Sequence, residues 1–101
     1  MDKYEKLLSK VKANLIIDHE DDDKLLLGFI HAAVDYAEEF QNVKYGRRKF
    51  PPSTEQAIIL LATHFYESRD GGSGGFMTTA KGSDIMTAVD RLLSLGKAWH
   101  F

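Results

Sequence analysis

The acidic run "DHEDDD", Asp18 to Asp23, is the stretch whose residue types come closest to a metal site. Hard cations such as Ca²⁺ bind clustered carboxylate oxygens. An EF-hand loop that began at Asp18 would need glycine at its sixth position and glutamate at its twelfth, where this sequence has Asp23 and Phe29. We therefore interpret the acidic run as the solvated start of a helix and expect no metal there.

The histidines are the remaining candidates for metal binding or acid–base chemistry, and they are His19, His31, His64 and His100. No HExxH motif occurs, and no two of them lie four residues apart on one helix. His64 stands next to Phe65 and Tyr66, which is typical of a histidine at the edge of a core. The chain has no cysteine, which excludes thiol catalysis, disulfides and Cys-based zinc sites. We expect no metal and no cofactor.

The glycine run "DGGSGG", Asp70 to Gly75, resembles a phosphate-binding loop only in composition. A P-loop ends in Gly-Lys-Ser/Thr and opens a helix, whereas "TTAKGS" has these residues in the wrong order. The glycines are better explained as slack between helices. Because no nucleophile, general base and oxyanion donor converge at a recognisable spacing, we predict that the protein is not an enzyme.

Arg47, Arg48 and Lys49, here called the basic patch, leave two interpretations open. They form a solvated loop, or they contact a phosphate backbone or an acidic protein surface. The chain has a formal net charge of −2, whereas nucleic-acid-binding domains are typically basic. A small helical DNA-binding or regulatory protein that uses this patch is therefore the alternative function.

The spacing of apolar residues predicts two helices in the first half of the chain. A short one covers residues 3–13, with Tyr4, Leu7, Leu8 and Val11 on one face. A long one covers about 21–42, and one of Asp21 to Asp23 should cap it. Its apolar stripe consists of Leu26, Ile30, Ala33, Ala37 and Phe40, widened by Phe29 and Tyr36.

Two more helices are predicted in the second half. Ser53 and Gln56 match a capping box, so a helix should run from Ser53 to about Ser68. The last helix should begin at a cap formed by Ser83 or Asp84 and end near Gly96. Its apolar face consists of Ile85, Val89, Leu92 and Leu93.

These elements predict an all-α fold with a single domain over residues 1–101. Three main helices and a short N-terminal one form a small bundle, with a flexible loop at about 70–82 and a tail at about 97–101. The N-terminus lacks the apolar core of a signal peptide, and the longest apolar run, Ala57 to Ala62, is too short to span a bilayer. We expect a soluble intracellular protein with no membrane contact.

The helix in "FPPSTEQAIILLATHFYESRD" is apolar around nearly its whole circumference. A helix of this kind has to be covered on all sides. The neighbouring helices of the same chain could cover it. A second copy of the protein could also cover part of it, because small cores gain stability from oligomerisation.

Three stretches together resemble the small head–tail connector (adaptor) proteins of long-tailed bacteriophages, which are also described as DNA-packaging proteins. They are "LLSKVKANLIIDHEDDDKLLLGFIHAAVDYAEEF", "FPPSTEQAIILLATHFYESRD" and "AVDRLLSLGKAW". The resemblance implies a helical protomer that assembles into a ring of about a dozen subunits under the portal. Such a ring would complete the head after DNA packaging and dock the neck and tail.

The resemblance also implies partners and places. The partners would be further copies of the chain, the portal protein and the next neck or head-completion protein. The protein would be found in the bacterial cytoplasm before assembly and in the virion neck afterwards. The strongly apolar third helix, with Ile58, Leu61 and Phe65, would be the core helix. We interpret Trp99 and Phe101 as the anchor that faces the portal.

On this interpretation the basic patch meets one of two partners. It faces packaged DNA in the channel, as a non-specific contact, or it faces Asp21, Asp22 and Asp23 of a neighbouring protomer. We favour the neighbour, because a channel through which DNA must slide should not bind phosphate strongly.

Overall fold

The computed structural model describes residues 3–68 and 80–98, with side chains for residues 3–68 and 84–95. This part of the chain folds into α1 (Lys3–Leu15), α2 (Asp23–Gln41), α3 (Pro52–Ser68) and α4 (Ala80–Ala98). The described residues form no strand, and the predicted all-α fold is confirmed. The limits predicted for the first two helices lie within two residues of those observed.

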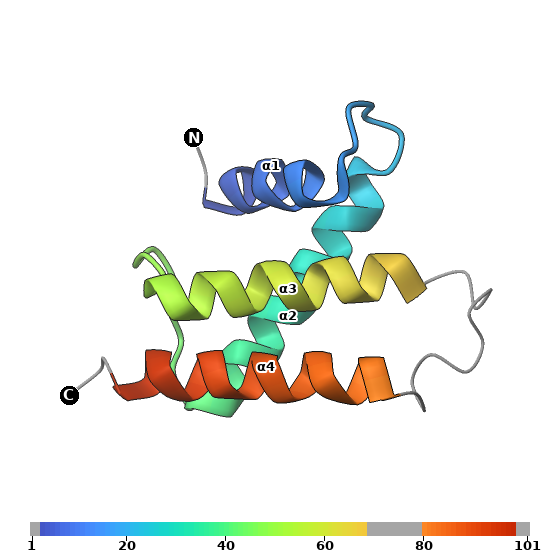
Figure 1. Ribbon diagram of the computed structural model, residues 1–101. Helices are drawn as coiled ribbons and strands as arrows, with labels where there is room; N and C mark the ends of the chain where they lie inside the picture. The colour runs from blue at the N-terminus through green and yellow to red at the C-terminus, as the bar shows by residue number, and fades with distance from the viewer. Residues whose placement is uncertain (1–2, 69–79, 99–101) are drawn as a thin grey trace.

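The central element is α3, which lies between α1 and α4 while α2 crosses behind (Figure 1). It packs against each of the other three helices. Ile58 and Leu61 are each 1% exposed, and Phe65 is half-buried with its ring centroid 6.0 Å from that of Phe29. Of the two ways to cover this apolar helix, the protomer therefore uses its own helices.

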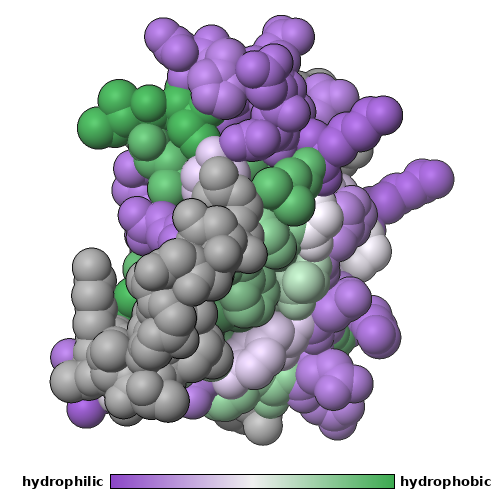
Figure 2. All heavy atoms as spheres, turned by 90° about the vertical axis from the view of Figure 1, so that its right-hand side faces the viewer, coloured by the Kyte–Doolittle hydropathy of each residue, from purple (hydrophilic) through white to green (hydrophobic). Residues whose placement is uncertain are grey.

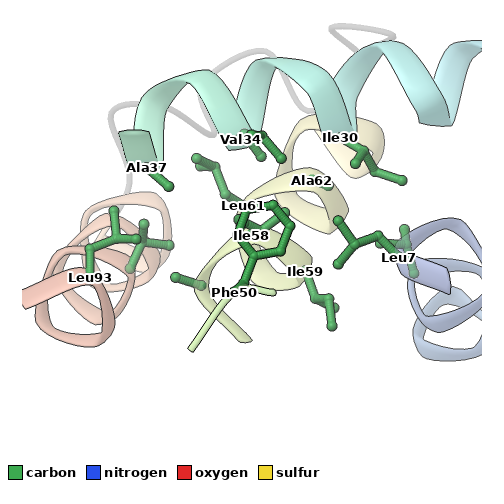
Figure 3. Packing of buried hydrophobic residues seen from close by; sticks show 14 of the residues in the cluster. Leu7, Ile30, Val34, Ala37, Phe50, Ile58, Ile59, Leu61, Ala62 and Leu93 are labelled. Atoms are coloured by element: carbon green, nitrogen blue, oxygen red, sulfur yellow. The ribbon is translucent and has the colours of Figure 1, made fainter. Parts of the chain in front are cut away.

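The core lies where the four helices meet (Figure 3). Ile30 and Val34 point from α2 towards the side of α3, Ile30 on the side of Leu7, while Leu7 of α1 and Leu93 of α4 close the two sides. Each aliphatic side chain of this size contributes about 1.5–3 kcal/mol when fully buried. The predicted apolar faces of α1 and α4 accordingly include the buried Leu7, Val11, Val89 and Leu93.

One position of the predicted stripe on α2 is wrong. Phe40 was expected in the core but is 37% exposed, whereas its neighbour Gln41 is only 2% exposed. The reason is the helical period: Gln41 lies four residues beyond the buried Ala37 and continues its row, while Phe40 lies at the edge of the stripe.

Gln41 is tolerated in the core because its amide is fully engaged. Its Nε2 donates to Thr54 Oγ1 and to the Leu93 carbonyl oxygen, each at 2.8 Å. The buried Tyr45 hydroxyl donates to Gln41 Oε1. This network joins the end of α2 to the start of α3 and to the backbone of α4.

The predicted starts of α2 and α3 need correction, the first in its capping hydrogen bond and the second in its first residue. Asp22 is at the N-cap of α2, but its side chain makes no capping hydrogen bond and instead accepts one from the Tyr66 hydroxyl. α3 begins at Pro52, not at Ser53, and Glu55 N donates to the Pro51 carbonyl oxygen at 2.9 Å. Proline suits the first helical position because it has no N–H to leave unpaired and its φ is already helical.

The last helix is longer than predicted at both ends. It begins at Ala80, so Ser83 and Asp84 lie inside its first turns, and it continues beyond Gly96 to Ala98. Ala80 and Lys81 are strong helix formers, which favours extension of the helix ahead of Gly82. The predicted loop at 70–82 and the predicted tail at 97–101 therefore each overlap α4.

Candidate interaction surfaces

The connection between α1 and α2 begins with a tight hydrogen-bonded helix end. Ile16 N donates to the Ala13 carbonyl oxygen at 3.2 Å, and Ile17 N donates to the Lys12 carbonyl oxygen at 2.9 Å. This pair of bonds is a Schellman motif, whose closing residue adopts a left-handed conformation. Here that residue is Ile16, with φ 58°.

Isoleucine is unfavourable at this position, because a left-handed conformation costs an L-residue about 1–2 kcal/mol. α2 ends in the same motif, and there Asn42, a residue that tolerates the conformation, has φ 57°. The Ile16 side chain gains nothing from packing in return, since it is 92% exposed. The protomer therefore presents an apolar side chain on a strained backbone.

The acidic run follows directly after this residue. Asp22 accepts the hydrogen bond from Tyr66, and Asp23 Oδ1 forms an ion pair with Lys12 Nζ at 2.8 Å, so these two carboxylates join α2 to α3 and α1. Asp21 is different, with a side chain that is 91% exposed. Figure 2 faces this end of the molecule and shows hydrophilic side chains at the top with an exposed apolar group beside them.

The basic patch belongs to the connection between α2 and α3, which two aromatic residues anchor. Tyr45 and Phe50 are buried and pack edge to face, with ring centroids 5.0 Å apart. Lys3 Nζ lies 4.2 Å from the Phe50 ring centroid and donates to the Arg48 carbonyl oxygen at 3.0 Å. With both ends of the segment fixed, Arg47, Arg48 and Lys49 are exposed.

Arg48 is also held in place by its own side chain. Its Nη2 donates to the Lys44 carbonyl oxygen at 2.7 Å, and its guanidinium lies 5.7 Å from the Tyr45 ring centroid. Lys44 itself is 85% exposed, with Nζ 3.8 Å from Glu38 Oε1. The exposed cations of this connection thus extend back to the end of α2.

The acidic run and the basic patch do not meet within the protomer. They belong to the connections at opposite ends of α2 (Figure 1). At a rise of 1.5 Å per residue, α2 separates them by roughly 28 Å. The two charged surfaces therefore lie far apart within the protomer.

Two hollows lie on the outer surface of α2 and α4. The α2 hollow is lined by Asp35, Tyr36, Glu39, Phe40 and Lys44, and the α4 hollow by Thr87, Asp90, Arg91, Ser94 and Leu95. The Tyr36 hydroxyl donates to Asp90 Oδ1 at 2.8 Å and so joins one hollow to the other. Burial raises the pKa of Tyr36, and the hydrogen bond and charge of Asp90 raise it further. The Tyr36 hydroxyl therefore stays protonated at neutral pH and keeps its hydrogen bond to Asp90.

The sequence candidates for chemistry are spread over the molecule. His31 is exposed and stacks on Tyr4, with ring centroids 4.4 Å apart, while His64 is buried. Within the described part of the chain, no three His, Asp or Glu residues gather closely enough to hold a metal ion. Trp99 and Phe101, interpreted from the sequence as the portal-facing anchor, lie outside the described residues.

Comparison with protein families shows what kind of protein carries these surfaces. The model of the phage gp6-like head-tail connector proteins matches residues 5–92. The chain belongs to this family. The resemblance noticed in the sequence is therefore confirmed, and the match covers most of all four helices. Comparisons with curated proteins and with solved structures found no significant match.

Proteins of this connector family are structural parts of the phage particle. They act between head and tail through contacts with other head and tail proteins. The outer surfaces that could contact other proteins are therefore the features of this connector that bear most on its function. Among the described helices, none is both long and apolar enough to cross a bilayer. Sequence analysis singled out the basic patch and the acidic residues, but not Ile16 or the α2 hollow.

Proposed function

We propose that this connector assembles as a ring under the portal of the phage head, completes the head after DNA packaging, and docks the neck and tail. The family match over residues 5–92 is the observation that carries the proposal. Side-to-side contacts between identical copies close into a ring when the rotation per copy divides a full turn. Two oppositely charged connections at opposite ends of α2 support a contact of this head-to-tail kind.

For the contact between protomers, we propose that the basic patch faces the acidic run of the next copy. Asp22 is bonded to Tyr66 and Asp23 to Lys12 inside the protomer, whereas Asp21 has the His19 ring 3.9 Å from its Oδ2 and still keeps a side chain that is 91% exposed. Asp21 is the exposed member of the predicted acidic trio and is the best placed to pair with Arg47 of a neighbour. Complementary charges of this kind mainly fix register and accelerate association.

For the contact with the portal, we propose Trp99 and Phe101. Aromatic side chains are enriched among the residues that carry most of the energy of an interface. The surface of the described residues bears few large apolar side chains, namely Ile16, Leu25, Phe40 and Leu95.

Deletion of the gene from the phage that encodes it tests the function, with rescue by a plasmid copy. We expect the deletion to give DNA-filled heads without tails in electron micrographs, and the wild-type copy to restore tailed particles. W99A/F101A and R47E/R48E copies should fail to rescue, although circular dichroism shows them folded. K6E/K24E, which reverses two exposed lysines elsewhere, is the control and should rescue. Normal tailed particles from the deletion strain would contradict the proposal.

A further inference from the structure

Ile16 has no role within the protomer that accounts for it. Its backbone is in the left-handed region, where glycine or asparagine would be unstrained, and its side chain is 92% exposed. Backbone strain of this kind persists at positions where function requires the residue. An exposed, β-branched apolar side chain on a rigid helix end is suited to insertion into a hollow of a partner.

The α2 hollow has the features of a matching receptor. Its wall includes Phe40, which is 37% exposed although its helical position adjoins the core stripe. Lys44 lines the same hollow, and Arg48 is bonded to the Lys44 carbonyl oxygen, so the basic patch continues from its rim. The hollow thus offers the exposed Phe40 ring between charged side chains, with positive charge at its rim, and this arrangement complements an apolar residue followed by acidic ones.

The arrangement of charges decides which group enters the hollow. Asp35 and Glu39 also line it, so a carboxylate of the acidic run would be repelled from the hollow itself. An uncharged side chain is not repelled. The uncharged Ile16 is therefore the better candidate for the hollow, and the exposed Asp21 is the better candidate for the cations next to it.

The two surfaces cannot meet within one protomer, because they lie towards opposite ends of α2 (Figure 1). A partner that carries a hollow of this kind is, however, present in every assembly of this chain, namely the next copy. Such a contact is heterologous, since each copy offers a different surface to each neighbour, and contacts of this type can continue around a ring.

We propose that Ile16 of one connector protomer inserts into the α2 hollow of the next, against Phe40, and that Asp21 faces Lys44 and Arg47 across the rim. This inference deepens the proposed function and rests on it, because it names the surfaces by which the ring under the portal closes. It also assigns a role to the strained residue at the end of α1.

Cysteine cross-linking on the assembled complex tests the contact, and the natural chain has no cysteine to interfere. An I16C/F40C variant is mixed with the portal protein of the same phage, oxidised, and analysed on a non-reducing gel. We expect a ladder of covalent oligomers that dithiothreitol collapses to the monomer. An internal disulfide is excluded, since it would require Cα atoms within about 7 Å. The matched control is I16C/L95C, in which the second cysteine replaces a more exposed leucine of the α4 hollow.

Cross-linking by random collision would be stronger in the I16C/L95C control, because Leu95 is 58% exposed and Phe40 only 37%. A ladder as strong in I16C/L95C as in I16C/F40C would therefore overturn the inference. Assembly of I16C/F40C on the portal without any ladder would also overturn it, yet would leave the proposed ring standing. Failure of the wild-type protein to assemble with the portal would overturn both.

A mixing experiment provides the second readout, and it uses variants that each lack one surface. An I16N protomer keeps the hollow, and an F40S protomer keeps Ile16. Alone, each should assemble at least about tenfold more weakly than wild type. Mixed, they share one intact interface, so native mass spectrometry should detect a 1:1 heterodimer that does not extend. Equal assembly by I16N and wild type would contradict the proposal.

Discussion

At the scale of single residues, the ends of α1 and α2 form a natural comparison. Both helices close with the same hydrogen-bonded motif and the same left-handed backbone, but the closing residue is Ile16 in one and Asn42 in the other. Asparagine favours this conformation and isoleucine does not. The first helix predicted at residues 3–13 leaves Ile16 outside any helix, yet the sequence does not reveal that Ile16 is left-handed and exposed, because the exposure depends on the surrounding helices.

Replacing Ile16 with asparagine should therefore stabilise the isolated protomer. We expect Ile16→Asn to raise the free energy of unfolding by about 1 kcal/mol, the scale of the relieved strain. For a domain of this size, that corresponds to an increase in Tm of roughly 4–8 °C. Thermal unfolding monitored by circular dichroism measures the change.

The reverse substitution at the equivalent position is the control. Asn42→Ile introduces the same strain at the end of α2 and should lower Tm by a similar amount. A fall in Tm for Ile16→Asn would show that the isoleucine stabilises the fold, and it would remove the reason to seek its function at an interface.

At the scale of helices, the sequence predicts the apolar faces better than the ends. Periodicity locates the buried rows of α1, α2 and α4 because burial repeats with the helical turn. The starts of α3 and α4 were misplaced because several residues compete to begin a helix and local propensity decides only weakly. The burial of Gln41 was not predicted, because a polar residue enters a core only where groups on other helices form hydrogen bonds with it.

Removal of this amide should be costly. Gln41→Ala removes the side-chain donor to the Leu93 carbonyl and one hydrogen bond each from the Tyr45 and Thr54 hydroxyls in the core. We expect a loss of about 3 kcal/mol, since a buried polar group without its partner costs about 1–3 kcal/mol. Urea unfolding measures it.

Gln56→Ala makes the same chemical change on the exposed face of α3 and serves as the control. Its effect should stay within about 0.5 kcal/mol, as is usual for exposed positions. Similar losses in both variants would mean that the buried network does not hold the three helices together.

At the scale of the whole molecule, the order of helices and motifs along the chain was sufficient to place it among head-tail connectors, and the family match over residues 5–92 confirms that placement. The relation between its surfaces was not predictable in the same way. The helix predicted at about 21–42 already separates the acidic run from the basic patch, but the bonds of Asp22 to Tyr66 and of Asp23 to Lys12 depend on how α1 and α3 pack against α2, which no local pattern encodes.

Native mass spectrometry of the protein, alone and mixed with the portal protein of the same phage, is the first test of ring assembly under the portal. We expect a closed ring of about a dozen copies, either free or bound to the portal. A protein that remains monomeric and ignores the portal at micromolar concentration would contradict it.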